Sequence, residues 1–159
     1  MISGKRYHTG FISVYDFINH IYIQCPKCSN RAEVISDAND RVHTRMTCVH
    51  CGMNQQWLTN EEPKAILVGK PVDCYFRYPV WLQCVAGKEI LFAYNYEHLI
   101  FLEQFITARL RERSKDQYGW RNSSLQSRLP AWMLSAKNRI QVLKAIEKLK
   151  KKYYLAKSG

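Results

Sequence analysis

Four cysteines in two Cys-x-x-Cys pairs are the residues of this sequence with the clearest chemistry. The segment CPKCSNRAEVISDANDRVHTRMTCVHC places Cys25 and Cys28 before a run of nineteen residues, and Cys48 and Cys51 after it. Two thiolates in one tight turn can bind the same ion, so two such turns supply a tetrahedral shell of four sulfurs. Gly52, directly after the second pair, permits the left-handed conformation that such a turn needs. The spacing therefore predicts a metal site.

The predicted ion is Zn²⁺, and its predicted role is structural. Iron in rubredoxin-type sites also binds four thiolates, but the predicted β-ribbon and the lack of a redox-partner motif favour zinc. A closed shell of four sulfurs leaves no position for water or substrate, whereas catalytic zinc keeps one open. We therefore expect one structural zinc ion, which stabilises a segment too short to be held by its own core.

Cys74 and Cys84 lack the spacing of the two pairs. Two buried free thiols are the favoured interpretation, and a second metal site completed by a histidine is the alternative.

The rest of the sequence contains no phosphate-binding loop, nucleophile elbow or kinase signature. Glu97 and His98 place an acid beside a base, but adjacent residues of a helix point about 100° apart. We expect a protein that is not an enzyme. The enzymatic alternative would use Glu97, His98 and Tyr94.

The positive charge lies mainly in the last third of the chain. The 159 residues carry a net charge of +11, and residues 101–159 alone carry +10. This asymmetry predicts an anionic partner, either nucleic acid or an acidic protein. A solvated helix face is the alternative interpretation for the lysines. The candidate binding residues are Arg109, Arg111, Arg113, Lys137, Arg139, Lys144, Lys148, Lys151, Trp81 and His98.

The elements that must position the cysteines are short strands. Apolar and β-branched residues predict strands at 21–24, 31–36, 42–47 and 54–58, and a further short strand at 64–69. The first four would form a zinc ribbon with the cysteine pairs in its turns.

A hairpin and helices are expected to position the basic residues. The segment WLQCVAGKEILFAYN predicts a β-hairpin that turns at Gly87. Asn95 is the predicted N-cap of a helix from Tyr96 to Arg113. A last helix is expected from Arg139 to Lys152. Its apolar face would comprise Leu143, Ile146 and Leu149, and its opposite face Lys144, Lys148 and Lys151.

Together these elements predict an α+β protein. Residues 1–60 would form the zinc ribbon, a small antiparallel β-structure with an N-terminal extension. Residues 61–159 would form a β-hairpin packed on two to three α-helices, the last of them basic. No apolar run is long enough to cross a membrane and no signal peptide is recognisable, so we expect a cytoplasmic protein with no membrane partner. No small-molecule substrate is expected.

Several segments together resemble an uncharacterised bacterial zinc-ribbon protein family. They are CPKC, CVHCG, YFRYPVWLQ, ILFAYNYEHLIFLEQFITARLRER and NSSLQSRLPAWMLSAKNRIQVLKAI. In that family a transcription-factor-type ribbon precedes a WLQ segment, a YN-x-EHL helix and an LP-x-W…AKNR segment. The resemblance extends from about residue 20 to residue 149, and this chain departs from it at Cys74, where the family has proline. It implies the ribbon fold but no particular activity.

The family-like polar and aromatic positions form either a partner-binding surface or a buried network. These positions are Trp81, Gln83, Asn95, Glu97, His98, Trp132, Lys137, Asn138 and Arg139. We expect a non-enzymatic zinc-ribbon binding module that contacts nucleic acid through its basic C-terminal third. The alternative is a protein-binding module, such as a bacterial antitoxin, an immunity protein or an adaptor that caps a partner.

Overall fold

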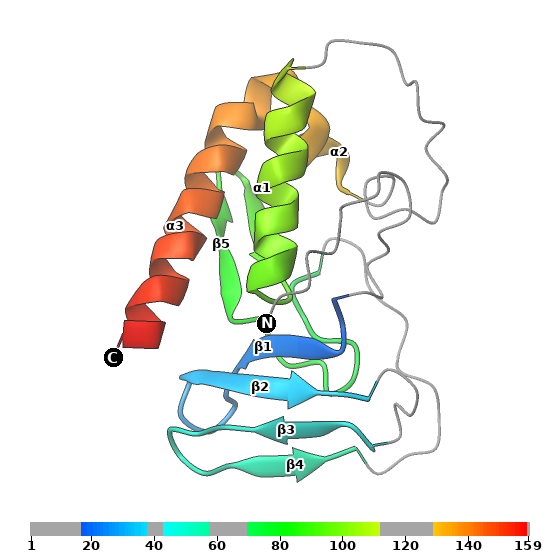
Figure 1. Cartoon of the computed structure of the whole chain (residues 1–159), viewed down its shortest axis with the longest axis vertical. Coiled ribbons are helices and arrows are strands. Elements are labelled where there is room, and N and C mark those ends of the chain that lie inside the picture. The colour runs from blue at the N-terminus through cyan, green and yellow to red at the C-terminus, as the bar shows by residue number, and fades with distance from the viewer. Residues whose placement is uncertain (1–16, 38–42, 58–69, 112–128, 159) are drawn as a thin grey trace, which may run out of the picture.

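The chain is an α+β protein, as its sequence predicts (Figure 1). The computed structural model describes residues 17–37, 43–57, 70–111 and 129–158. Along the chain, the elements in these ranges are β1 (His20–Gln24), β2 (Arg31–Ile35), β3 (Arg45–Thr47), β4 (Asn54–Gln56), β5 (Leu82–Ala86), β6 (Glu89–Ala93), α1 (Tyr96–Arg111), α2 (Ala131–Leu134), the short 3₁₀ helix η4 (Ala136–Asn138) and α3 (Arg139–Ser158). The strand predicted at 64–69 and the predicted domain boundary at residue 60 lie outside the described residues.

The first four strands form an antiparallel sheet in the order β1-β2-β3-β4. The apolar residues Ile21, Val34 and Met46 are direct neighbours across β1, β2 and β3, and none is exposed to solvent. The two cysteine pairs lie in the connections β1–β2 and β3–β4. In an up-and-down antiparallel sheet, both of these connections lie at the same end (Figure 1). Strand order therefore brings the two pairs together.

A separate hairpin, β5–β6, leads into the helices. Gly87 occupies its turn with φ of +67°, a conformation that glycine adopts without a steric penalty. The predicted helix cap is confirmed, because the side-chain oxygen of Asn95 accepts a hydrogen bond of 2.8 Å from the N–H of His98. Helix α3 packs against β5 and α1 and continues beyond the predicted end at Lys152 to Ser158. No helix in the described ranges is both long and apolar enough to cross a bilayer.

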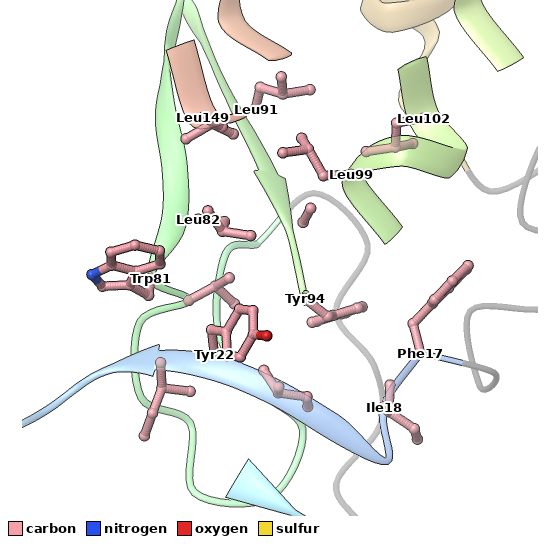
Figure 2. Packing of buried hydrophobic residues seen from close by; sticks show 14 of the residues in the cluster. Phe17, Ile18, Tyr22, Trp81, Leu82, Leu91, Tyr94, Leu99, Leu102 and Leu149 are labelled. Carbon is pink, nitrogen blue, oxygen red and sulfur yellow. The ribbon is translucent and has the colours of Figure 1, made fainter. Parts of the chain in front are cut away.

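The four-stranded sheet and the helical part share one hydrophobic core. The N–H of Tyr22 in β1 donates to the carbonyl of Tyr94 over 2.8 Å, and the N–H of Trp81 donates to the carbonyl of Tyr22 over 2.9 Å. Figure 2 shows Tyr22, Trp81 and Leu82 together where the hairpin meets β1. These residues belong to one continuous cluster that also includes Leu99 of α1 and Leu149 of α3. The ribbon is therefore joined to the helical part by backbone pairing as well as by packing.

Candidate metal centre and basic helix face

The two cysteine pairs lie in turns of the same construction. In the first turn the N–H of Ser29 donates to the carbonyl of Cys25, and in the second the N–H of Gly52 donates to the carbonyl of Cys48, each over 2.9 Å. Both donors have a left-handed backbone, with φ of 65° at Ser29 and 78° at Gly52. This conformation suits Gly52 and is strained at Ser29, whose Cβ approaches the following carbonyl oxygen.

The four cysteine sulfurs gather at one point. All four lie within 4.8 Å of one another, and two pairs, Cys25–Cys51 and Cys28–Cys48, are 3.6 Å apart. Sulfurs in a tetrahedron about 2.3 Å from a central ion would be about 3.8 Å apart, which agrees with these separations. One cysteine of each turn is buried and the other is half-buried. The predicted ligands are thus assembled so that they could hold a metal ion.

The electrostatics of the cluster favour a cation at its centre. The backbone N–H of Asn30 is the main cause that lowers the pKa of the Cys28 thiol to about 6. At Cys51 the N–H of Met53 lowers the pKa, but burial and the neighbouring cysteines outweigh it and raise the value to about 11. Thiolates this close repel one another, so all four ionise together only around a positive ion. The donor set fits a metal such as zinc.

The remaining two cysteines lie away from this cluster. In the described ranges, the four sulfurs of the ribbon are the only cluster of histidine, cysteine or carboxylate ligands that could hold a metal ion. Cys74 is buried, and the half-buried Cys84 donates its S–H to the carbonyl of Ala145 over 3.6 Å. Burial raises the pKa of the Cys84 thiol. Neither forms a disulfide with a described cysteine, and the contact of Cys84 joins β5 to α3.

Asn95 and His98 belong to a buried network between β1 and α1. The amide of Asn95 donates to the carbonyls of Phe17 over 3.0 Å and His20 over 2.8 Å. Nδ1 of His98 accepts a hydrogen bond of 3.0 Å from the N–H of Tyr94, and its ring stacks between the rings of Phe17 and Tyr94. Only 4% of His98 is exposed. Against the expectation that His98 contacts a partner, its ring lies in the core.

Burial also determines the protonation of His98. It lowers the pKa of the imidazole to about 3, so the ring is neutral near pH 7. In the described part of the chain, no hydrogen-bond partner lies near its Nε2. Glu97 is exposed whereas His98 is buried, so the two side chains do not share a site.

Three of the predicted basic residues form an exposed row on α3. Lys144, Lys148 and Lys151 follow one another at intervals of four and three residues, which places them on one face of the helix. The opposite face is buried and includes Ile146 and Leu149. Among the described residues, no carboxylate lies within ion-pair distance of the three ammonium groups. We call Lys144, Lys148 and Lys151 the lysine row.

Two other lysines of α3 are bound within the chain. The ammonium of Lys150 forms an ion pair of 3.0 Å with Glu103 of α1. Lys152 donates to the carbonyl of Trp81 over 2.6 Å and lies 4.5 Å from the centre of its indole ring. The guanidinium of Arg31 lies 5.6 Å from the same ring, and only 9% of Trp81 is exposed. Trp81 therefore anchors the end of α3, and little of its ring could reach a partner.

The other predicted basic residues are distributed around these elements. Lys137 is exposed on η4, and Arg139 is half-buried at the start of α3. Arg109 and Arg111 belong to the last turn of α1, but their side chains lie outside the described part of the structure, as does the whole of Arg113.

A group of tyrosines near the end of α3 was not predicted from the sequence. The ring of Tyr153 stacks on Tyr96 of α1 at 4.3 Å and on Tyr22 of β1 at 6.0 Å. The hydroxyl groups of Tyr96 and Tyr154 lie 2.7 Å apart and share a hydrogen bond. The pair of tyrosines directly after three lysines was a usable signal in the sequence. Their partners Tyr22 and Tyr96 come from distant segments, so the group itself could be found only in the structure.

The fold and site define an α+β protein with a candidate four-cysteine metal centre and a basic helix face. Comparisons of the chain with known protein families, with curated proteins and with solved structures find no match. The resemblance to bacterial zinc-ribbon proteins stays a prediction that rests on the quoted segments.

Proposed function

We propose that this chain is a non-enzymatic zinc-ribbon module that binds nucleic acid through α3. The observation that carries the proposal is the lysine row, three exposed ammonium groups on one helix face with no carboxylate of the described residues within ion-pair distance. Ammonium groups arranged in this way can each neutralise a phosphate and release its counterions. The charge of the helix supports this role, because residues 139–158 contain seven basic residues and one acidic residue.

In this proposal the metal has a scaffolding role. Four cysteine sulfurs would complete the shell of a zinc ion and leave no open position for a reacting water. The ribbon that the ion stabilises holds Tyr22, against which Tyr153 of α3 stacks. The metal centre would thereby help to fix the position of the basic helix. The resemblance to a bacterial zinc-ribbon family agrees with this assignment.

The proposal is tested by the salt dependence of binding. The triple variant Lys144→Ala, Lys148→Ala, Lys151→Ala should bind labelled DNA and RNA more weakly than the wild type. Its slope of log affinity against log salt should be smaller by about two to three. The matched control is Lys27→Ala, Arg45→Ala, Lys70→Ala, which removes the same charge from exposed positions outside α3 and outside the β5–β6 hairpin that packs on it. Undetectable binding at about 50 mM salt, or equal losses in both triple variants, would contradict the proposal.

A protein partner is the second candidate, and an exposed apolar pair favours it. Val85 and Ile90 are direct neighbours across the β5–β6 hairpin, with 70% and 45% of their surfaces exposed. Such a patch suits the apolar centre of a protein interface, as expected for an immunity protein or an adaptor. This candidate predicts salt-tolerant binding to one protein. Val85→Asp should abolish this binding, and the lysine-row variant should retain it. A quantitative pull-down followed by mass spectrometry distinguishes the two.

A further inference from the structure

We infer that the nucleic acid is single-stranded and that Tyr154 stacks on one of its bases beside the lysine row. This inference rests on the proposed function and deepens it. The relevant segment is the last part of α3, where Lys151 and Lys157 flank Tyr154 three residues away on either side.

Tyr154 presents an aromatic surface to solvent and is held in place by its neighbours. The residue is 53% exposed. Its hydroxyl group shares a hydrogen bond with that of Tyr96, and its ring forms T-shaped contacts with the rings of Tyr96 and Tyr153, with centroids 5.7 Å apart in both cases. Tyr153 itself stacks on Tyr22 and Tyr96, and these contacts help to fix the position of the Tyr154 ring. A ring that is already positioned loses little conformational freedom when a ligand binds.

Cations lie on both sides of this ring. Lys151 and Lys157 are exposed, and residues three apart on a helix have Cβ atoms about 5–6 Å from each other. A base stacked on Tyr154 would thus have an ammonium group within reach of the phosphates that precede and follow it. Burial raises the pKa of the adjoining Tyr96 hydroxyl to about 12, so this hydroxyl is uncharged at neutral pH.

The combination of a ring and a row of lysines favours a single strand over a duplex. In a duplex the faces of the bases are covered by their neighbours, so an exposed tyrosine has no face to stack on. In a single strand any base offers its face, and stacking on an aromatic side chain is tolerant of sequence. The lysine row follows one helix face over about 10 Å, which suits one sugar–phosphate backbone.

Binding of labelled 20-nucleotide strands measured by fluorescence anisotropy tests this inference. The probes are single-stranded DNA, single-stranded RNA of the same sequence and the corresponding DNA duplex. We expect Tyr154→Ala to weaken binding to both single strands about tenfold, to leave duplex binding unchanged and to leave the salt slope unchanged. Tyr154→Phe retains the ring and should bind within about twofold of the wild type.

Leu155→Ala is the matched control, because Leu155 is 74% exposed at the same end of α3. Tighter binding to the duplex than to the single strands, or equal effects of Tyr154→Ala and Leu155→Ala, would overturn the inference. If the lysine-row variant loses affinity while Tyr154→Ala does not, the proposed function stands and this inference fails. If no probe binds the wild type, both fail.

A second copy of the chain is the other possible occupant of this surface. Size-exclusion chromatography of the wild type and Tyr154→Ala addresses it directly. The inference expects the same apparent mass for both proteins. A wild-type oligomer that Tyr154→Ala dissociates would show that the ring contacts another copy and would overturn the assignment to a base.

Discussion

The ammonium group of Lys152 donates a hydrogen bond of 2.6 Å to the carbonyl of Trp81 and lies over the indole ring of the same residue. This contact joins α3 to the point where the β5–β6 hairpin meets β1. The ammonium of Lys152 is partly withdrawn from water, and this burial lowers its pKa. Lys152 therefore has a structural role, whereas Lys151, the preceding residue, is exposed to solvent.

Replacing Lys152 by alanine should reduce the free energy of unfolding by about 1–3 kcal/mol, because a hydrogen bond from a charged group and a cation–π contact are lost together. Lys151→Ala should change it by less than about 0.5 kcal/mol, as expected for an exposed residue. Urea denaturation of the metal-loaded protein, followed by tryptophan fluorescence, measures both. Equal effects of the two substitutions would show that the contact with Trp81 contributes little.

His98 should make the protein sensitive to acid. Its pKa is about 3 in the folded state because the ring is buried, and about 6.5 in the unfolded chain. The unfolded state therefore binds the proton more readily, so stability is complete above about pH 6.5 and is lost as the pH falls toward 3. Between pH 7 and pH 5 the loss attributable to this residue is about 2 kcal/mol.

The comparison of His98→Gln with His43→Gln isolates this effect, because acid also protonates cysteine ligands in every variant. His43 is exposed, so His43→Gln is the control for loss of a histidine at the surface. His98→Gln should be less stable at pH 7 but should lose less stability between pH 7 and pH 5. If both variants retain the wild-type dependence in urea titrations at the two pH values, His98 is not responsible.

Each cysteine turn has one residue with a left-handed backbone, Ser29 in the first and Gly52 in the second. Substitutions at these two positions should change the stability of the protein in opposite directions. Ser29→Gly relieves a strained backbone and should stabilise the metal-loaded protein by up to about 1 kcal/mol. Gly52→Ser introduces the same strain and should destabilise it by about 1–2 kcal/mol. Thermal unfolding measures both variants. A loss of stability in both would mean that the Ser29 side chain contributes more than its strained backbone costs.

Removal of the metal should disturb the helical part as well as the ribbon. The backbone hydrogen bonds of Tyr22 with Tyr94 and Trp81 couple the two parts, so loss of the ribbon exposes part of the common core. A chelator should release about one zinc ion per chain, measured by elemental analysis, and should reduce the near-ultraviolet circular dichroism. Cys48→Ser should mimic this loss. A purified protein without bound metal, or an unchanged spectrum after chelation, would contradict this prediction.

Local features of the sequence were sufficient to predict much of the fold. The spacing of the cysteines, the glycine of the hairpin turn and the cap at Asn95 all act within a few residues of the chain, where geometry is nearly independent of context. The end of α3 was less predictable. The helix continues past Lys152, where Tyr153 stacks on Tyr22 and Tyr96 from other parts of the chain.

The sequence by itself determined which residues could bind a metal and where the positive charge is concentrated, because residue type and spacing follow directly from the order of the chain. Only the tertiary structure decided what each charged or aromatic residue does. In the folded chain His98 is buried in the core and Lys152 is hydrogen-bonded to Trp81. Lys151 and Tyr154 are exposed to solvent. Burial and long-range contacts make these distinctions, since they depend on segments that lie far apart in the sequence and meet only when the chain folds.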